Sequence, residues 1–361
     1  MKHVKLFEFN SYIDSAIENV IAPFLQESLR NGKKKVLLKP NILLAAAPDR
    51  AVTTHPIFLE KIIHTLKKIG IDDLFLADSP GAHYVEYERV LRITGISEIC
   101  IKNNVNILKV EKYKPKILGD MYISSIIDDM DILINIPKLK THSLMGLTLG
   151  VKNLFGLVPG MHKVQMHRNY PNNNKLALKL YEFSKSIEHK TINILDGIIG
   201  MDGEGPSRGS PINTSLVALS DNATAMDIAV TKMLNLPVPF CKTNRAAMSS
   251  GFDGDNIKVE KNNLTFKRKI RKPISYGVNL LPSFIRQRFA NMIYIKPEID
   301  QQKCTHCKHC YRICPAKAIN NNNNMLNIDK NLCFECFCCY EICEYSAIKL
   351  NRSLIHRVFV K

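Results

Sequence analysis

Two short segments near the end of the 361-residue chain carry nine of its eleven cysteines. The first reads CTHCKHCYRIC and the second reads CFECFCCYEIC, so both contain the spacing C-x2-C-x2-C-x3-C. The cysteines of the first spacing recur 29 residues later in the second: Cys304, Cys307, Cys310 and Cys314 become Cys333, Cys336, Cys339 and Cys343. The segments are therefore an internal repeat, and thiols at these intervals can wrap an iron-sulfur cluster.

The spacing resembles the bacterial ferredoxin run C-x2-C-x2-C-x3-C-P. In that run three cysteines bind one 4Fe-4S cluster, and the fourth binds the cluster of the other half. The resemblance implies two crossed ligand sets: Cys304, Cys307, Cys310 and Cys343 for the first cluster, and Cys333, Cys336, Cys339 and Cys314 for the second.

Two other uses of the cysteines remain open. A disulfide framework is typical of short secreted chains, whereas this sequence is long and its first residues lack the apolar core of a signal peptide. Structural zinc is usually held by separated pairs of C-x-x-C, so the triplets favour iron and sulfur. The second segment departs from the run where Glu344 replaces the proline that Pro315 supplies in the first. It also carries an additional thiol, Cys338, which we interpret as a free cysteine.

Residues 1–257 alternate between short apolar runs and amphipathic segments. The apolar runs predict buried strands at 35–38, 74–77, 105–110, 131–136, 191–195 and 215–220. Residues 57–69 predict an amphipathic helix that ends before Gly70, and a second helix is expected between Asp221 and Pro237. This alternation predicts an α/β body with a mainly parallel sheet in Rossmann-like layers, followed by a small α+β ferredoxin-like domain with two 4Fe-4S clusters.

The composition, with 45% hydrophobic and 23% charged residues, is that of a globular protein of more than one domain. We expect four parts: an α/β domain at 1–257, a basic linker or docking segment at 258–297, the dicluster domain at 298–351 and a tail at 352–361. No run of about 18 uncharged apolar residues occurs, so we expect no transmembrane segment. Oxygen-sensitive clusters indicate a reducing compartment, and we expect a cytoplasmic protein.

The net charge of +17 is concentrated in residues 258–296, where ten Lys and Arg face one acid, Glu260. The simplest interpretation is a solvated linker. An alternative is a docking surface for an acidic redox partner protein, or peripheral contact with an anionic membrane through residues 276–295. Nucleic acid is not expected as a partner, because no nucleic-acid-binding motif accompanies the charge.

Polar residues follow four of the expected strands at their carboxyl ends. In chain order they are Lys39, Asn41, Asp78, Lys138, Lys140, His142 and Asp196. Ligands of open α/β sheets bind in the crevice beside those ends, so we expect one shared site. Lys39 and Lys138 can meet there only if their strands lie close together in the sheet. The alternative is that strand ends are polar because loops are polar.

The residue types of this site favour an anion. Lys152 and Asn153 add to the lysines and asparagines that can gather around a carboxylate or phosphate. The glycine-rich stretch 200–209 allows close backbone approach but matches no nucleotide fingerprint, so a flavin is an open alternative that the sequence itself does not indicate. A metal or an acid–base pair in the body is the open alternative, drawn from His55, His142, His162, His167, Asp78, Asp196, Asp202 and Glu204.

Four segments of the body resemble the domain-of-unknown-function 362 family of iron-sulfur proteins. They read KPNILL, LADSPG, NIPKLKTHSLMGLTLGVKNLFGLVPGMHKVQMH and DGIIGMDGEGPSRGSP, and the cysteine repeat follows them. The resemblance implies an α/β body joined to a ferredoxin-like module, without a settled reaction.

Two functions are compatible with these patterns. The first is an oxidoreductase whose clusters pass single electrons to or from an anionic ligand in the crevice, which requires the crevice to face the cysteine module. The second is a non-enzymatic electron carrier or redox-responsive binding protein, which needs only the clusters. The large body favours the first function, because a carrier works without such a body.

Overall fold

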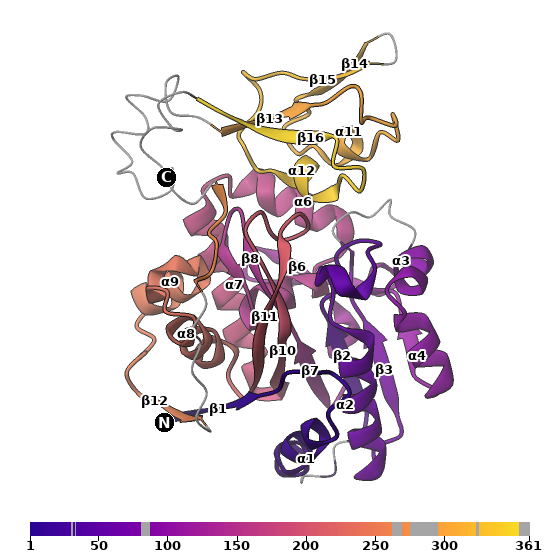
Figure 1. Cartoon of the computed structure of the whole chain (residues 1–361), viewed down its shortest axis with the longest axis vertical. Coiled ribbons are helices and arrows are strands. Elements are labelled where there is room, and N and C mark those ends of the chain that lie inside the picture. The colour runs from indigo at the N-terminus through magenta and orange to yellow at the C-terminus, as the bar shows by residue number, and fades with distance from the viewer. Residues whose placement is uncertain are drawn as a thin grey trace.

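The computed structural model describes residues 1–29, 32, 34–80, 87–261, 269–274, 295–322 and 325–353. Figure 1 shows an α/β body with a small module above one end of its sheet. A ten-stranded sheet forms the centre of the body. Its strands are β1 (Lys2–Glu8), β2 (Val36–Pro40), β3 (Leu74–Ala77), β4 (Asn106–Leu108), β7 (Ile132–Ile136), β8 (Lys138–His142), β9 (Gly146–Thr148), β10 (Thr191–Asp202), β11 (Ser210–Ser220) and β12 (Ile257–Lys261).

The strand order is β12-β1-β11-β10-β7-β2-β3-β4, with β8 on β10 and β9 on β8. Strands β10, β7, β2, β3 and β4 run parallel, whereas β11 is antiparallel to both of its neighbours. The mainly parallel α/β body is therefore confirmed. Strand β8 was not expected, because its sequence KLKTH reads as a polar loop although every residue in it is buried.

Helices cover both faces of the sheet, as parallel sheets require. Along β11, Val217 packs in the apolar cluster that includes Ile17 of α1. Its neighbours Leu216 and Ala218 pack in a second cluster, with Val230 of α8. The helices of the body are α1 (Ala16–Ser28), α2 (Pro56–Lys68), α3 (Tyr87–Ile93), α4 (Ile96–Lys102), α5 (Gly150–Asn153), α6 (Gly160–Asn169), α7 (Asn173–Ser186), α8 (Ala223–Met233) and α9 (Lys242–Ser249).

The two helices expected from the sequence are α2 and α8. Helix α2 begins with Pro56, whose fixed φ suits a first turn, and it is followed by Gly70 at a positive φ of 84°. The side chain of Asn222 caps α8 by accepting a hydrogen bond from Ala225 N at 2.7 Å. Proline and glycine therefore mark the two ends of α2, and the Asn222 cap marks the start of α8. A hairpin of β5 (Pro115–Leu118) and β6 (Met121–Ser124) lies outside the main sheet.

The module is built from two antiparallel strand pairs and two short helices. Strand β13 (Ile295–Ile299) pairs with β16 (Ile348–Arg352), and β14 (Ile319–Asn322) pairs with β15 (Met325–Ile328). Helices α11 (His309–Ile313) and α12 (Cys338–Ile342) begin 29 residues apart. Residues in the left-handed region recur with the same offset: His306 and Glu335, Lys308 and Phe337, Lys317 and Ser346. The sequence repeat is thus also a repeat of backbone conformation.

The strands shift the expected domain boundaries outward. Strand β12 pairs with β1, so the body continues to Lys261 rather than ending at residue 257. The module extends from Ile295 to Arg352, because β13 and β16 pair along their whole length. Most of the basic segment and of the tail lies outside the described residues. Within the described ranges, no helix has the length and apolar character needed to cross a bilayer.

Candidate functional site

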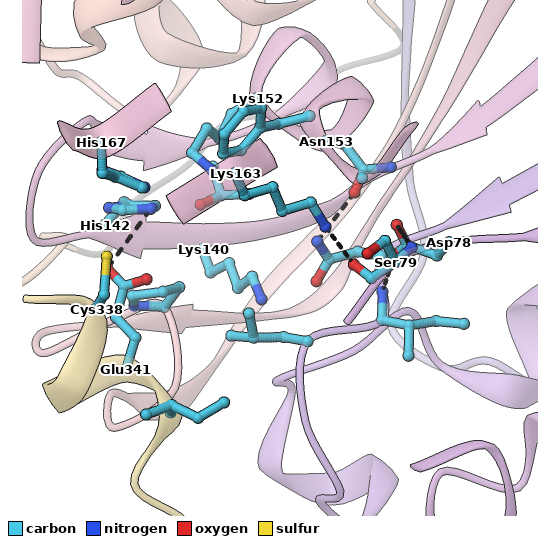
Figure 2. Close-up of a pocket in the computed structure, with 18 of the residues that line it drawn as sticks. Asp78, Ser79, Lys140, His142, Lys152, Asn153, Lys163, His167, Cys338 and Glu341 are labelled. Carbon is cyan, nitrogen blue, oxygen red and sulfur yellow. Dashed lines mark hydrogen bonds and ion pairs between the residues drawn. The ribbon is translucent and has the colours of Figure 1, made fainter. Parts of the chain in front are cut away.

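A cavity of about 100 Å³ lies between the body and the module. Segments following β2 and β3, strands β8 and β9, and helices α5 and α6 form its body side, and α11 and α12 form its module side (Figure 2). Its charged and polar lining residues are Asn41, Asp78, Ser79, Lys140, His142, Thr148, Lys152, Asn153, Lys163, His167, Cys338 and Glu341. The expected anion-site residues all line it except Lys39, Lys138 and Asp196.

The strands that lead to Lys39 and Lys138 are neighbours, as the site hypothesis required. Lys39 in β2 stands opposite Asn135 in the parallel strand β7, and Lys138 follows β7 directly at the start of β8. Lys138 in turn stands opposite Asp196 of β10. Lys39 thus lies near the carboxyl end of β2 and Lys138 just beyond that of β7. Asp196 does not follow its strand as expected from the sequence, because β10 continues to Asp202 and Asp196 lies within it.

Lys39 is paired within the fold. Its Nζ lies 2.8 Å from Asp78 Oδ1, and both side chains are buried. The second oxygen of Asp78 accepts a hydrogen bond from Ile42 N at 2.6 Å. A Cβ at Gly156 would overlap Asp78 Oδ1 and Lys39 Nζ, so this position needs glycine. Lys39 therefore compensates the charge of Asp78 from behind the cavity wall.

Lys138 is paired in the same way with Asp196, at 2.8 Å, and neither side chain is exposed. Tyr12 completes the group, because its hydroxyl donates to Asp196 Oδ1 at 2.9 Å and accepts from Lys138 Nζ at 2.8 Å. Main-chain N–H groups of His55 and Ile199 donate to Asp196 and to Tyr12. Both members of this buried pair are engaged within the fold, and removing either one would leave an uncompensated buried charge.

Three other lysines line the cavity without a carboxylate partner among the described residues: Lys140, Lys152 and Lys163. Lys140 and Lys163 each donate to a main-chain carbonyl at 2.6 Å. The Nζ of Lys152 lies 4.6 Å from the centre of the Phe155 ring, a cation–π contact. The cavity therefore holds more lysines than the carboxylates of its walls can pair with.

Burial lowers the pKa values of these lysines, and neighbouring lysines lower them further. Burial lowers the pKa of Lys140 to about 7, and repulsion from Lys152 lowers it further in the same direction. Burial likewise lowers the pKa of Lys163 to about 8. An anion in the cavity would stabilise the ammonium form of each, because opposite charge favours ionisation.

Helix α5 presents Lys152 and Asn153 to the cavity, and it is fixed at its first turn. The carboxylate of Asp227 in α8 accepts hydrogen bonds from Gly150 N at 2.7 Å and Val151 N at 3.0 Å. A carboxylate at a helix N-terminus satisfies N–H groups that have no partner in the helix. The short helix is therefore held by a buried residue of another element.

Two histidines of the cavity are neutral. Burial lowers the pKa of His142 well below its usual value and that of His167 to about 3. His142 Nδ1 accepts from Leu144 N at 3.1 Å, so the neutral ring carries its proton on Nε2. That nitrogen lies 3.8 Å from Glu341 Oε1 of the module (Figure 2). His142 therefore offers one N–H donor toward the module.

The other titratable residues considered for a metal or for acid–base chemistry are engaged elsewhere. His55 stacks on Tyr12 with ring centres 3.9 Å apart, and the His162 ring lies 4.5 Å from that of Tyr122. Asp202 binds the Arg271 side chain, and Glu204 accepts from a main-chain N–H. In the parts of the chain that the structure describes, no three His, Cys, Asp or Glu residues are arranged around a single ion.

The module contributes Cys338 and Glu341 from α12 to the cavity wall (Figure 2). Burial raises the pKa of Glu341 to about 7 although Lys152 opposes that shift. Its Oε1 accepts from Ser143 Oγ at 3.3 Å. Cys338 is two residues from Cys336, a predicted cluster ligand, and the proximity of the two thiols lowers the pKa of Cys336 and raises that of Cys338. One wall of the cavity is therefore in contact with the second cysteine segment.

Arginines of the body hold the module in place. Arg208 donates to the main-chain oxygens of Ile348 and Cys343, and its guanidinium carbon lies 4.1 Å from the centre of the Tyr340 ring. Arg89 of α3 forms a bidentate pair with Glu344, with N–O distances of 3.0 and 2.9 Å. Glu344, where the ferredoxin run has proline, is thus a contact between the two parts.

The predicted cluster ligands of the first set come together in space. Cys304, Cys307, Cys310 and Cys343 line one small cavity of about 20 Å³ in the module. This group mixes the first three cysteines of one segment with the fourth of the other. In the second set, burial raises the pKa of Cys339 well above its usual value, and Cys336, Cys333, Cys314 and also Cys310 of the first set add to that rise. Thiolate sulfur is the usual donor to iron-sulfur clusters, so the donor chemistry fits such a group.

The fourth cysteine of each segment accepts the same kind of main-chain hydrogen bond. Cys314 Sγ accepts a hydrogen bond from Ala318 N, and Cys343 Sγ accepts one from Ala347 N, both at 3.3 Å. Main-chain donors to a ligand sulfur stabilise its thiolate and influence cluster potential. The two halves therefore offer equivalent environments at these positions.

Sequence reasoning missed Lys163, Ser79 and the module residues Cys338 and Glu341 as cavity residues. Lys163 falls in the stretch 135–167 that carries the family resemblance most specifically, so a signal was present. For Glu341 no such signal exists, because its position depends on how the module docks.

Comparison with protein families gives two matches. The model of the domain of unknown function DUF362 matches residues 36–232, and a 4Fe-4S binding domain matches residues 296–319. The second match covers the first cysteine segment but not the second, which starts at Cys333.

The thylakoid-associated protein sll1697 of Synechocystis sp. is 32% identical over 207 residues, which are 56% of this chain and 63% of that relative. The chain thus spans less than two thirds of the relative's length. Among solved structures, the lactate racemase apoprotein from Thermoanaerobacterium thermosaccharolyticum is similar over 63% of this chain and 56% of that one. Its TM-score of 0.41 and identity of 12% support no functional argument.

Proposed function

The chain belongs to the DUF362 family and contains a 4Fe-4S binding segment, and on this premise we propose that it is an iron-sulfur oxidoreductase acting on a small anion. The anion binds in the cavity between body and module, and two 4Fe-4S clusters are held by the crossed cysteine sets. When bound, such clusters supply or accept single electrons.

The observation that carries this proposal is the shared wall of the cavity. Lys140, Lys152 and Lys163 from the body face the same space as Cys338 and Glu341 from the module. Cys338 directly precedes the predicted ligand Cys339 and is two residues from the predicted ligand Cys336. An oxidoreductase requires its substrate site to face the redox group, whereas a carrier does not.

The body's residues would act by binding and by excluding water. Lys140, Lys152 and Lys163 hold the negative charge, and Asn41 orients the ligand from the end of β2, while Asn153 of α5 fixes the amide of Asn41. Lys39 and Lys138 stay outside these contacts, because Asp78 and Asp196 already pair with them.

The crossed ligand sets are tested by iron analysis of anaerobically purified protein. We expect about eight irons per chain, the content of two 4Fe-4S clusters. Cys314→Ala should damage the cluster of Cys333, Cys336 and Cys339 and leave the other intact, as seen by paramagnetic resonance of the reduced protein. Cys338→Ala is the matched control and should retain all the iron. Stoichiometric zinc in place of iron would reject the proposal.

A non-enzymatic carrier is the second candidate, and oxidation of the reduced protein distinguishes the two. An oxidoreductase should be reoxidised by members of a panel of small carboxylates and phosphorylated compounds, and Lys152→Met should slow that reaction. Reoxidation by a redox protein at an exposed cluster should be unaffected by the same change. If only redox proteins reoxidise the chain, the carrier function is correct.

An acidic redox partner protein remains part of the proposal. Its support is the basic segment 258–296, of which only 258–261, 269–274 and 295–296 are among the described residues. Electron exchange with an acidic carrier should then slow as salt increases, because exposed charges are screened beyond about 8 Å at physiological ionic strength. Neutralising Lys267, Arg268, Lys269, Arg271 and Lys272 should slow it at low salt, and unchanged rates would return the segment to a linker.

A further inference from the structure

A chain of asparagine side chains crosses the sheet and ends at the cavity. Asn193 of β10 donates through Nδ2 to Ser220 O at 3.3 Å, and its Oδ1 accepts from Asn135 Nδ2 at 2.8 Å. Asn135 of β7 also donates to Gly150 O at 3.0 Å. A main-chain carbonyl can only accept, so each of these amides is fixed with its nitrogen toward that carbonyl.

The same logic fixes the last two amides. Asn153 Nδ2 donates to Lys39 O at 3.2 Å and to Asn135 Oδ1 at 2.8 Å, which leaves Asn153 Oδ1 as an acceptor. Asn41 Nδ2 donates to it at 2.9 Å. The chain therefore orients Asn41 with its amide nitrogen inward, and the remaining polar atom of that side chain is the oxygen.

Asn41 Oδ1 is a buried acceptor with no hydrogen-bond partner in the described part of the chain. Asn41 lines the cavity, and so does Thr148, whose Oγ1 also has no partner there. A buried acceptor without a donor is unfavourable, and asparagine could relieve this only by turning its amide, which the chain of hydrogen bonds opposes. A ligand that carries its own donor would supply the partner that Asn41 Oδ1 lacks.

The cavity's size and charge restrict that ligand. Its volume of about 100 Å³ is smaller than the roughly 150 Å³ cavity that accommodates benzene, so the ligand has only a few heavy atoms. The three cavity lysines require negative charge. Ammonium groups can only donate, so they cannot distinguish a protonated oxyanion from an unprotonated one, whereas an amide oxygen can.

We propose that the cavity selects a small oxyanion that carries its own O–H or N–H donor, such as a hydroxycarboxylate or hydrogen phosphate. It rejects an anion of similar size and charge that lacks a donor. Asn41 is the specificity-determining residue, and the lysines supply affinity without selectivity. The inference rests on the proposed function in one respect, that the cavity binds an anion.

Calorimetric titration of the anaerobically purified full chain with two matched pairs tests the proposal. The pairs are glycolate against acetate, and inorganic phosphate against sulfate, all at pH 7. The donor-bearing member of each pair should bind about tenfold more tightly, the upper range for a neutral hydrogen bond. The pair with the higher absolute affinity tells whether the site takes carboxylates or phosphates.

Two variants separate selectivity from affinity. Asn41→Leu should bring both ratios close to one while the protein still binds anions. Lys152→Met should weaken all four ions by at least tenfold and leave the ratios unchanged, because it removes charge only. Lys102→Met, an exposed lysine of α4 paired with Glu60, is the control for charge loss and should change neither quantity. Iron content verifies that each variant is folded and loaded.

The possible results separate the anion site from its selection for a ligand with a donor. If all four ions bind and both pairs bind equally to the parent protein, the donor selection is wrong although the anion site stands. If no ion binds, the anion site and the selection fail together. If glycolate and phosphate bind preferentially but no small anion reoxidises the reduced protein, the selection stands and the oxidoreductase function fails. The comparison within each pair uses the parent protein, so misfolding of Asn41→Leu would not remove the test.

Discussion

The two halves of the cysteine module have the same backbone but different surroundings. Positions separated by 29 residues share left-handed φ angles and a hydrogen bond to the fourth cysteine. Yet Tyr311 of the first half is 46% exposed, whereas the matching Tyr340 is 5% exposed beneath Arg208 of the body. Helix α12 of the second half contributes Cys338, Glu341 and Ile342 to the cavity wall, whereas α11 of the first half contributes Ile313.

Two of the residues that differ between the halves face the body. Glu341 stands in the cavity where the first half has the exposed Arg312, and Glu344 pairs with Arg89 where the first half has Pro315. The repeat therefore preserves what holds the metal groups. The acidic residues Glu341 and Glu344 adapt the second half to a basic surface of the body. Sequence differences at these contact positions therefore mark the half that is docked.

The largest effect should come from replacing Glu341 of the second half with arginine, the residue at the matching position 312 of the first half. Glu341→Arg places a fourth positive charge among Lys140, Lys152 and Lys163 in a largely buried cavity. An uncompensated buried charge costs about 3–5 kcal/mol. Hydrogen–deuterium exchange should show α12 exchanging at least a hundredfold faster, since 1.4 kcal/mol corresponds to a factor of about ten.

The reciprocal change, Arg312→Glu, is the matched control. It alters an exposed position of α11 and should leave exchange in α12 unchanged. Equal effects of both changes would show that the two halves are not specialised in the way their surroundings indicate.

An intermediate effect is expected from pH, because the cavity-facing half lies against groups that titrate near neutrality. The pKa of Lys140 is about 7 and that of Lys163 about 8, and a bound anion raises both. The complex then holds more protons than the free protein, so affinity falls as pH rises above about 7. Deprotonation of Glu341, with its pKa of about 7, acts in the same direction.

Calorimetry with glycolate at pH 6.5, 7.5 and 8.5 measures this dependence. For each group that titrates, the affinity should decrease by up to about tenfold per pH unit above its pKa. Lys140→Met should flatten the curve. An affinity that increases with pH would contradict the assignment of the lysines as the anion-binding groups.

The smallest effect concerns the departure from proline. Glu344→Pro removes the bidentate pair with Arg89, a residue whose side chain is 38% exposed. Pairs near the surface contribute about 0–1 kcal/mol, so exchange in α12 should accelerate less than tenfold. Pro315→Glu in the first half should have no effect on docking. A loss as large as that of Glu341→Arg would make this pair, and not the cavity contact, the main link between the parts.

The sequence predicted features that depend on local pattern. The buried strands β2, β3, β7 and β10 appeared as apolar runs, and helices α2 and α8 appeared through periodicity and capping residues. Strand β8 was missed because its side chains are polar, and its burial follows from tertiary contacts such as Lys138 with Asp196.

The sequence could not tell which lysines have partners. Lys39 and Lys140 cannot be told apart in the chain, since each lies at or shortly after the end of an apolar run. The partner of Lys39 is Asp78, contributed from the end of another strand, and Lys140 has only a main-chain oxygen. Whether a charge is compensated is a property of the folded sheet, so only the structure separates fold-stabilising lysines from cavity lysines.

The contacts of Arg208 with the module have a kinetic consequence. Arg208 donates hydrogen bonds to two main-chain oxygens of the module and stacks on Tyr340. Helix α12 is therefore held at the cavity, and the module does not have to diffuse to it before each reaction. Transfer of an electron between the second cysteine segment and a bound anion would then be a unimolecular step. Its rate should be independent of protein concentration and of solvent viscosity, and it would be set by the fixed separation of the two groups.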